Sequence, residues 1–158
     1  MHALARGARE VYSLDISAQA LEVARQNALL NLSDPALHTI AKDAFVAMEE
    51  LKQKHQRFDI VVVDPPSFAK KASEVPGAIR SYERLAKLAI PLVNKGGTLV
   101  LASCSSRVKA DDFFAVAEQA LQQSGRRFQE QTKTFHDIDH PINIPEGAYL
   151  KCIYYRLG

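Results

Sequence analysis

Apolar runs that end in a carboxylate recur along the first part of the chain, and a helical pattern follows each of them. The clearest run is 58–63, where β-branched residues are nearly continuous until Asp64 and two prolines. Such a run is typical of a strand buried on both faces, and the prolines end it. In open α/β sheets, ligands bind outside the carboxyl ends of the strands, so we expect function to cluster at Asp64.

Two earlier segments repeat this order of strand, acid and helix. Residues 10–15 predict a short strand that ends at Asp15, and Ser17 is a suitable N-cap for the helix that follows. Residues 37–41 predict another strand, and Asp43 comes just before a second helical pattern. Both acids are therefore expected at strand ends.

The second half of the chain continues the alternation of strands and helices. Helices follow strands up to Gly125, which favours a parallel sheet with right-handed crossovers and an antiparallel hairpin at its far edge. The predicted fold class is thus α/β and Rossmann-like. In order, we expect a surface loop over 69–77, a helix over 82–92, a turn at Gly96-Gly97, a buried strand over 98–102, a helix over 109–123, and strands over 127–135 and 149–157.

The amino-acid composition indicates the class of protein but does not identify a function. The 158 residues, 47% hydrophobic and 24% charged, fit a single domain over 1–158. A net charge of +2 permits binding to polyanions but does not require it. The sequence has no secretory signal pattern and no run of apolar residues long enough to cross a membrane, so we expect a cytoplasmic protein. Cys104 and Cys152 lie far apart and the histidines are scattered, so neither a disulfide framework nor a metal site is predicted.

Four strand ends carry candidate chemistry, namely Asp15, Asp43, Asp64 and Cys104. Acids after two consecutive strands can accept hydrogen bonds from ribose hydroxyls and from a purine amino group. Either acid alone is as readily explained as a helix cap. Together, Asp15 and Asp43 favour an adenosine site.

Five segments of the sequence form a recognisable set. They are Val11 to Ser17, Lys42 to Phe45, Asp64 to Lys70, Leu101 to Ser106, and Asp139 to Ile142 together with Glu146 to Ile153. In the same order, they resemble the catalytic domain of class I S-adenosylmethionine-dependent RNA methyltransferases, and most of all the family that methylates carbon 5 of a cytosine in large-subunit ribosomal RNA. The resemblance covers essentially the whole chain, and its most specific part is the pairing of Asp-Pro-Pro-Ser-Phe with a later Ser-Cys-Ser at a strand end.

This resemblance implies a role for each strand-end residue, with S-adenosyl-L-methionine as the cofactor and ribosomal RNA as the partner. Asp15 would bind the ribose and Asp43 the adenine of the cofactor, while Asp64 would lie beside the methyl group and the target base. Cys104 would be the nucleophile that adds to carbon 6 of cytosine and activates carbon 5. To these we add Pro65 for the cofactor, and Pro66, Phe68, Lys70 and Arg107 for the RNA.

Other interpretations stay open at this point. Cys104 can be a small buried apolar residue, as free cysteines often are, and we expect this for Cys152 within the last predicted strand. Asp64-Pro65-Pro66 alone would also suit methylation of an exocyclic guanine or adenine nitrogen. A third interpretation is a non-catalytic fragment that binds RNA or oligomerises.

The sequence departs from the family pattern at its N-terminus. The family begins with an earlier strand and a glycine-containing loop near the methionine part of the cofactor, and this sequence starts after both. That strand lies between the strands ending at Asp15 and Asp64, so we expect an N-terminally truncated domain with two unpaired strand edges. Such a chain should bind S-adenosylmethionine weakly or not at all, and its free edges could pair in a homo-oligomer.

Overall fold

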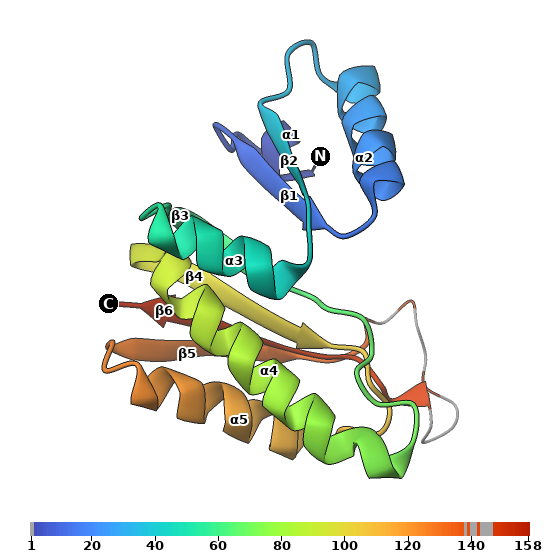
Figure 1. Ribbon diagram of the computed structural model, residues 1–158, viewed down its shortest axis with the longest axis vertical. Coiled ribbons are helices and arrows are strands. Elements are labelled where there is room, and N and C mark those ends of the chain that lie inside the picture. The colour runs from blue at the N-terminus through green and yellow to red at the C-terminus, as the bar shows by residue number, and fades with distance from the viewer. Residues whose placement is uncertain (1, 138, 140–141, 143–146) are drawn as a thin grey trace. The chain divides into compact units, whose positions relative to one another are not determined.

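The computed structural model describes residues 2–137, 139, 142 and 147–158. Three residues of the motifs quoted above, His140, Pro141 and Glu146, lie outside the described residues. Helices and strands alternate along most of the chain (Figure 1). Their bounds are α1 His2–Ala5, β1 Val11–Asp15, α2 Ala18–Asn31, β2 Leu37–Ala41, α3 Ala44–Gln53, β3 Phe58–Val63, α4 Val75–Ala89, β4 Val93–Ser103, α5 Ala110–Gln123, β5 Phe128–Thr134 and β6 Lys151–Leu157, with short 3-10 helices η1 Ala72–Glu74 and η2 Ile90–Leu92.

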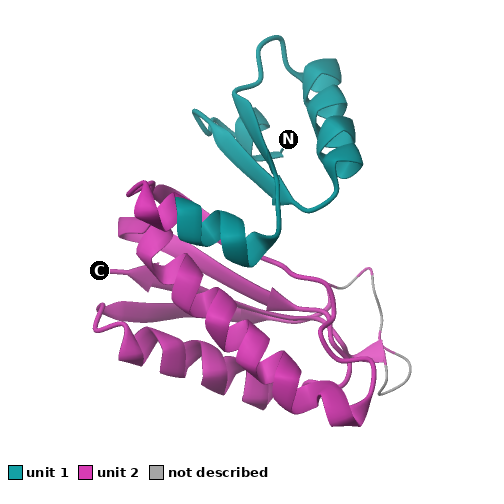
Figure 2. Cartoon of the chain, in the orientation of Figure 1, with its two compact units in different colours: residues 1–50 teal, residues 51–158 magenta. Residues whose placement is uncertain are grey.

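The chain forms two compact units, Met1–Glu50 and Leu51–Gly158 (Figure 2). Unit 1 contains a two-stranded sheet, and unit 2 contains a four-stranded sheet. That both belong to one catalytic domain stays a prediction.

In unit 1, β1 and β2 run parallel, and the last residue of β1, Asp15, pairs with Ala41 at the end of β2. The chain then turns into α2, whose N-cap is Ser17 as predicted: the Ala20 amide donates to the Ser17 hydroxyl at 3.2 Å. This cap satisfies one of the amides that a helix start leaves without a partner. Both strands therefore end at the same edge of their sheet.

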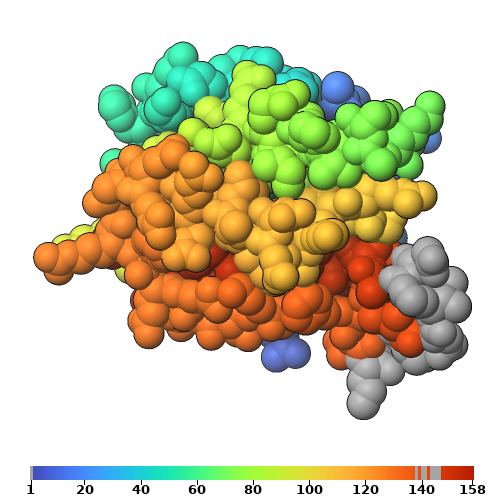
Figure 3. Space-filling view, turned by 90° about the horizontal axis from the view of Figure 1, so that it is seen from below, coloured from blue at the N-terminus to red at the C-terminus, as the bar shows by residue number. Residues whose placement is uncertain are grey.

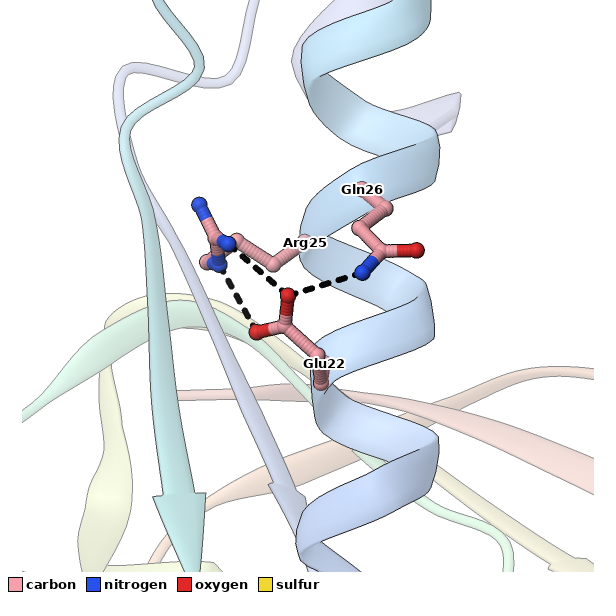
Figure 4. Close-up of polar contacts among 3 residues, drawn as sticks. All are labelled: Glu22, Arg25 and Gln26. Carbon is pink, nitrogen blue, oxygen red and sulfur yellow. Dashed lines mark hydrogen bonds and ion pairs between the residues drawn. The ribbon is translucent and has the colours of Figure 1, made fainter.

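The exposed face of α2 carries an ion pair (Figure 4). The Arg25 guanidinium donates to both carboxylate oxygens of Glu22, at 2.9 and 2.8 Å, and the Gln26 amide donates to the same carboxylate at 2.9 Å. These bonds hold the pKa of Glu22 at about 2, with the Arg25 bond as the largest cause. The cluster supports the helix locally, because residues three and four apart are neighbours on a helix surface.

In unit 2, the strand order is β3-β4-β6-β5. β3 and β4 are parallel, whereas β6 is antiparallel to both of its neighbours, β4 and β5. The predicted C-terminal hairpin is thus present, and its second strand is the one that joins the parallel pair. A βαβ crossover through α4 leads to β4, which places the ends of β3 and β4 side by side.

The prediction that residues 58–63 are buried on both faces is wrong. In the described part of unit 2, β3 pairs only with β4 and forms the edge of the sheet. Ile60 and Val62, which point to the same face of β3, are 64% and 63% exposed. A continuous β-branched run does not distinguish a central strand from an edge strand with an uncovered face.

Two boundaries also differ from the prediction. Residues 75–77 belong to α4 rather than to a loop, because Pro76 stands in the first turn of the helix, where its missing N–H costs nothing. Gly96 and Gly97 do not turn the chain but lie inside β4, where the pairing with β3 shifts its register. Gly96 has a φ of 72°, and a Cβ on Gly97 would lie 2.8 Å from the Val93 side chain. Both positions therefore require glycine inside a strand.

Helices α4 and α5 pack against each other and cover one face of the four-stranded sheet (Figures 1 and 3). Most of the buried apolar side chains belong to these helices and to β4 and β6. The largest of the fully buried ones are Tyr155, Phe113, Leu99 and Leu121. Unit 2 thus has a continuous core beneath the strand that ends at Ser103.

The Arg126 guanidinium connects several carbonyl groups at the other end of this sheet. It donates to the carbonyl oxygens of Ile90 at 2.9 Å, Val93 at 2.7 Å and Asn94 at 3.2 Å, and to that of Gly158 at 3.2 Å. Burial lowers the pKa of Arg126, as expected for a cation that loses water. The start of β4 and the end of β6 are therefore joined through one side chain.

Candidate active site

The carboxyl ends of β3 and β4 bring Asp64 and Cys104 together. Val63 pairs with Leu101 in the parallel ladder, Asp64 follows β3 directly, and Cys104 follows β4 directly. The Cys104 thiol donates to the carbonyl oxygen of Pro65, with Sγ 3.8 Å from that oxygen. The side chain of Cys104 is half-buried, and Asp64 is exposed. A thiol and a carboxylate therefore meet at an edge of the sheet that a ligand can reach.

Buried serines on both sides of Cys104 fix its backbone. Ser103 and Ser105 are fully buried. The Ser103 hydroxyl donates to the Tyr82 hydroxyl oxygen at 2.8 Å, and the Ser105 hydroxyl donates to the Ala69 carbonyl at 3.2 Å. Both flanking side chains therefore point into the protein. Of the three residues in the Ser-Cys-Ser segment, Cys104 lies nearest to the surface, next to Asp64.

Tyr82, a residue of α4, lies beneath Cys104 and Asp64 and is buried. Burial raises the pKa of Tyr82, the hydrogen bond from Ser103 opposes the rise, and the charges of Cys104 and Asp64 add to it. The phenol is therefore coupled electrostatically to both candidate catalytic groups. It stays neutral in the physiological range, because each of these charges disfavours a phenolate.

Lys151, the first residue of β6, is also part of the site. Its ammonium donates to the Ser105 carbonyl at 2.5 Å and to the Tyr149 carbonyl at 3.1 Å. Burial lowers the pKa of Lys151, and the negative charge of Cys104 opposes that change. A buried cation thus lies within electrostatic range of the thiol.

The predicted RNA-binding residues surround this centre in different ways. The ring of Phe68 packs against the ring of Tyr82 in a T-shaped arrangement, with 5.0 Å between the two centroids. Pro66, Lys70 and Arg107 are exposed. The backbone amide of Lys70 donates to the Glu74 carboxylate at 2.8 Å, and the side chain of Lys70 lies at the surface. These cations are placed where phosphate oxygens could approach.

Cys152 differs from Cys104 in its setting. It lies inside β6, opposite Ala102 of β4 and Thr134 of β5. Burial raises the pKa of the Cys152 thiol, and the Asp64 carboxylate raises it further. A thiol that resists ionisation is a poor nucleophile. Cys152 is nonetheless only half-buried, as Cys104 is, so the fully buried position predicted for it is not found.

In unit 1, Asp15 and Asp43 lie at the ends of β1 and β2. Asp15 Oδ1 accepts from the Ser17 amide at 2.8 Å, and Asp43 Oδ1 accepts from the amides of Phe45 at 3.0 Å and Val46 at 3.2 Å. Asp43 therefore caps the start of α3, as the alternative interpretation held, whereas Asp15 precedes the α2 N-cap Ser17 and holds the turn that leads to it. Each acid uses Oδ1 for these bonds, so Oδ2 of each exposed carboxylate is available to hydroxyl or amino donors. That the two carboxylates bind an adenosine group stays a prediction.

Sequence reasoning missed Lys151, Ser103 and Ser105. One signal could have identified the lysine: in β6 the buried positions alternate, and Ile153, Tyr155 and Leu157 occupy them after Lys151. A charged residue in phase with a buried stripe indicates a partner inside the protein.

The described residues contain no group of three or more histidine, cysteine, aspartate or glutamate side chains placed to hold a metal ion. Among the same residues, no helix combines the length and the apolar character that a membrane span needs.

Solved methyltransferase structures share this fold. One, a methyltransferase solved as a complex with SAH, matches with a TM-score of 0.80 at 20% identity, over 98% of this chain and 40% of that one. Another, an S-adenosylmethionine-dependent methyltransferase from Streptococcus mutans, matches with a TM-score of 0.83 at 17% identity, over the same shares of the two chains. The predicted fold is therefore confirmed: the chain has the Rossmann-like methyltransferase fold, mostly parallel, with a C-terminal antiparallel hairpin.

Sequence comparisons point the same way. The "Ribosomal RNA large subunit methyltransferase" of Deinococcus radiodurans is 39% identical over 158 residues, which are 99% of this chain and 39% of that protein. The "Ribosomal RNA large subunit methyltransferase I" of Aeromonas hydrophila is 37% identical over 99% of this chain and 40% of its own length. The chain thus spans about two fifths of the length of these relatives. The family model described as "Conserved hypothetical protein 95" matches residues 1–125, most of the sequence, and the chain therefore belongs to that family.

Proposed function

We propose that the protein containing this chain transfers a methyl group from S-adenosyl-L-methionine to carbon 5 of a cytosine in large-subunit ribosomal RNA. The names of the two relatives support the RNA substrate. The fold shared with a methyltransferase that was solved with SAH supports the cofactor. The observation that supports carbon 5 of cytosine as the target is the position of the Cys104 thiol, whose sulfur lies 3.8 Å from the Pro65 carbonyl oxygen and next to Asp64.

The chemistry of carbon 5 requires a nucleophile, because this carbon of cytosine is unreactive until the ring is activated. In the proposed reaction, the Cys104 thiolate adds to carbon 6, and the ring electrons that this addition releases make carbon 5 nucleophilic. Asp64, in its protonated form, donates to ring nitrogen 3, where negative charge would otherwise build up. Once carbon 5 has taken the methyl group, with the sulfonium left as a neutral thioether, a base removes the proton of carbon 5. The electrons of that C–H bond expel Cys104 from carbon 6 as the thiolate, which restores the ring.

The cofactor residues are Asp15, Asp43, Asp64 and Pro65. When bound, S-adenosylmethionine supplies an electrophilic methyl group on its sulfonium. Asp15 would accept from the ribose hydroxyls and Asp43 from the adenine amino group, each through Oδ2, the carboxylate oxygen that its backbone hydrogen bonds leave available. Pro66, Phe68, Lys70 and Arg107 would contact the RNA, the two cations by neutralising phosphates.

Two further features belong to this proposal. The outer edge of β3 and the exposed side chains of Ile60 and Val62 support association between two copies of the chain through that edge. A monomeric mass in solution would exclude this association.

A ribosomal RNA substrate supports the expected cytoplasmic location.

The test replaces each cysteine in turn. The protein is incubated with S-adenosylmethionine and large-subunit ribosomal RNA, and the RNA is digested to nucleosides for mass spectrometry. We expect 5-methylcytidine from the unchanged protein and from Cys152→Ala, and its loss by a factor of about 10³ or more in Cys104→Ala, since the covalent step is removed.

Other outcomes would overturn the proposal. Methylated adenine or guanine nitrogens that persist in Cys104→Ala would assign the protein to exocyclic nitrogen chemistry. RNA binding without any methyl transfer would assign it to a non-catalytic RNA-binding role.

A further inference from the structure

Lys151 occupies a position where the strand pattern calls for an apolar residue. It is 2% exposed and lies in phase with Ile153, Tyr155 and Leu157, which are all buried. In the β4–β6 ladder it stands opposite Ser103, the residue before Cys104. The strand therefore delivers a cation to the backbone that carries the thiol.

The ammonium contacts the chain just past the cysteine. It donates to the carbonyl of Ser105 at 2.5 Å, so the pairing with Ser103 and this hydrogen bond hold the segment on both sides of Cys104. A second hydrogen bond, 3.1 Å long, goes to the carbonyl of Tyr149. Carbonyl groups satisfy the hydrogen-bond donors of a buried ammonium, but only a nearby anion neutralises its charge.

The other titratable groups coupled to this site do not supply a positive charge. Asp64 follows β3, Tyr82 projects from α4, and Cys152 lies on β6. Each of them is neutral or negative. Arg107, three residues after Cys104, is exposed at the surface. Lys151 is thus the buried cation of this group. Burial lowers its pKa, and attraction to Cys104 opposes part of that change.

We propose that Lys151 is a positioning residue for Cys104: its ammonium holds the Ser103–Ser105 segment in place and stabilises the thiolate of Cys104. The inference rests on the role proposed for Cys104, because only a nucleophile needs the ionised form. By reciprocity, the interaction that stabilises the ammonium stabilises the thiolate equally. The charge acts on the cysteine and not on the RNA or the cofactor.

The test measures alkylation of Cys104 without RNA or cofactor. The rate of reaction with iodoacetamide is followed from about pH 6 to pH 10, a range that spans thiol ionisation. Peptide mass spectrometry separates the Cys104 peptide from the Cys152 peptide. Three variants are compared with the unchanged chain: Lys151→Met removes the charge, Lys151→Gln removes the charge but keeps amide donors for the two carbonyls, and Lys151→Arg keeps the charge. Lys87→Met is the matched control, because Lys87 lies on the surface and pairs with Glu83.

We expect the pH of half-maximal alkylation of Cys104 to rise by about 0.5 to 1 in the Met and Gln variants, which slows the reaction near neutral pH about three- to tenfold. The maximal rate at high pH, where the thiol is fully ionised, should stay unchanged. Lys151→Arg and Lys87→Met should keep the midpoint of the unchanged chain. Should the Met variant fail to fold, the Gln variant carries the test.

Two results would overturn the inference. One is an unchanged midpoint with an altered maximal rate, which would mean that Lys151 controls only access to the thiol. The other is no change in either quantity. Because alkylation requires neither RNA nor methyl transfer, these results are distinct from a failure of the proposed function, in which Cys104→Ala would retain methyl transfer.

Discussion

The two units place their functional residues on supports of very different strength. In unit 1, Asp15 and Asp43 stand at the end of a two-stranded sheet, and apolar side chains of α2 such as Leu29 and Leu30 are exposed. In unit 2, Cys104 stands at the end of a strand whose side chains are mostly fully buried. A two-stranded sheet is marginal by itself, whereas four strands covered by two helices form a core. The comparison teaches that the residues proposed for covalent chemistry have the more rigid scaffold.

Hydrogen exchange tests this contrast most strongly. Amides of β4 and β6 should be protected about a thousandfold more than those of β1 and β2, a difference of roughly 4 kcal/mol in the free energy of local opening. The physical reason is that opening of β1 and β2 exposes little buried apolar surface. Exchange followed by mass spectrometry, corrected for intrinsic rates, gives the comparison. Equal protection of both sheets would show that unit 1 is as stable as unit 2.

A pair of leucine truncations makes the same comparison in energy. Leu99 in β4 is 0% exposed and Leu30 in α2 is 82% exposed. Leu99→Ala should lower the free energy of unfolding by about 3 kcal/mol, because it leaves a cavity, and Leu30→Ala should change it by less than about 0.5 kcal/mol. Urea unfolding followed by tyrosine fluorescence is suitable, since four of the five tyrosines belong to unit 2. A similar loss in both variants would remove the contrast.

The smallest effect concerns the ion pair on α2. The pKa of Glu22 is about 2 in the folded chain against an ordinary 4.5, so its contribution to stability is fully present above about pH 4.5. That contribution is lost as the pH falls from there through 2. A carboxyl titration by carbon NMR should give a midpoint near 2, and Arg25→Met should return it toward 4.5. A midpoint that does not respond to the loss of Arg25 would mean that this guanidinium is not the cause.

The order of the elements could be predicted from the sequence because apolar runs alternate with helical patterns along most of it. Ser17 was identified as a cap and Gly125 as a helix end, since both act through their own local backbone. The convergence of Asp64 and Cys104 could be expected as well, because parallel neighbours carry their ends to the same edge.

The remaining features depend on contacts between distant residues. Ile60 and Val62 look like core residues until the strand order shows that β3 is an edge. The two glycines before Thr98 have the composition of a turn, yet close packing against β3 makes them part of a strand. The role of Lys151 becomes visible only once β6 is paired with β4, which places this lysine opposite Ser103.

The Arg126 side chain has a consequence for the other end of the sheet. Arg126 joins the start of β4 to the residue after β6, and Lys151 joins the end of β4 to the start of β6. A slip of one residue between these antiparallel strands would break both connections at once and would turn the buried side chains of β6 away from the core. The two cations thus act as a register lock for β4 and β6, while the pairing of β3 with β4 sets Cys104 beside Asp64.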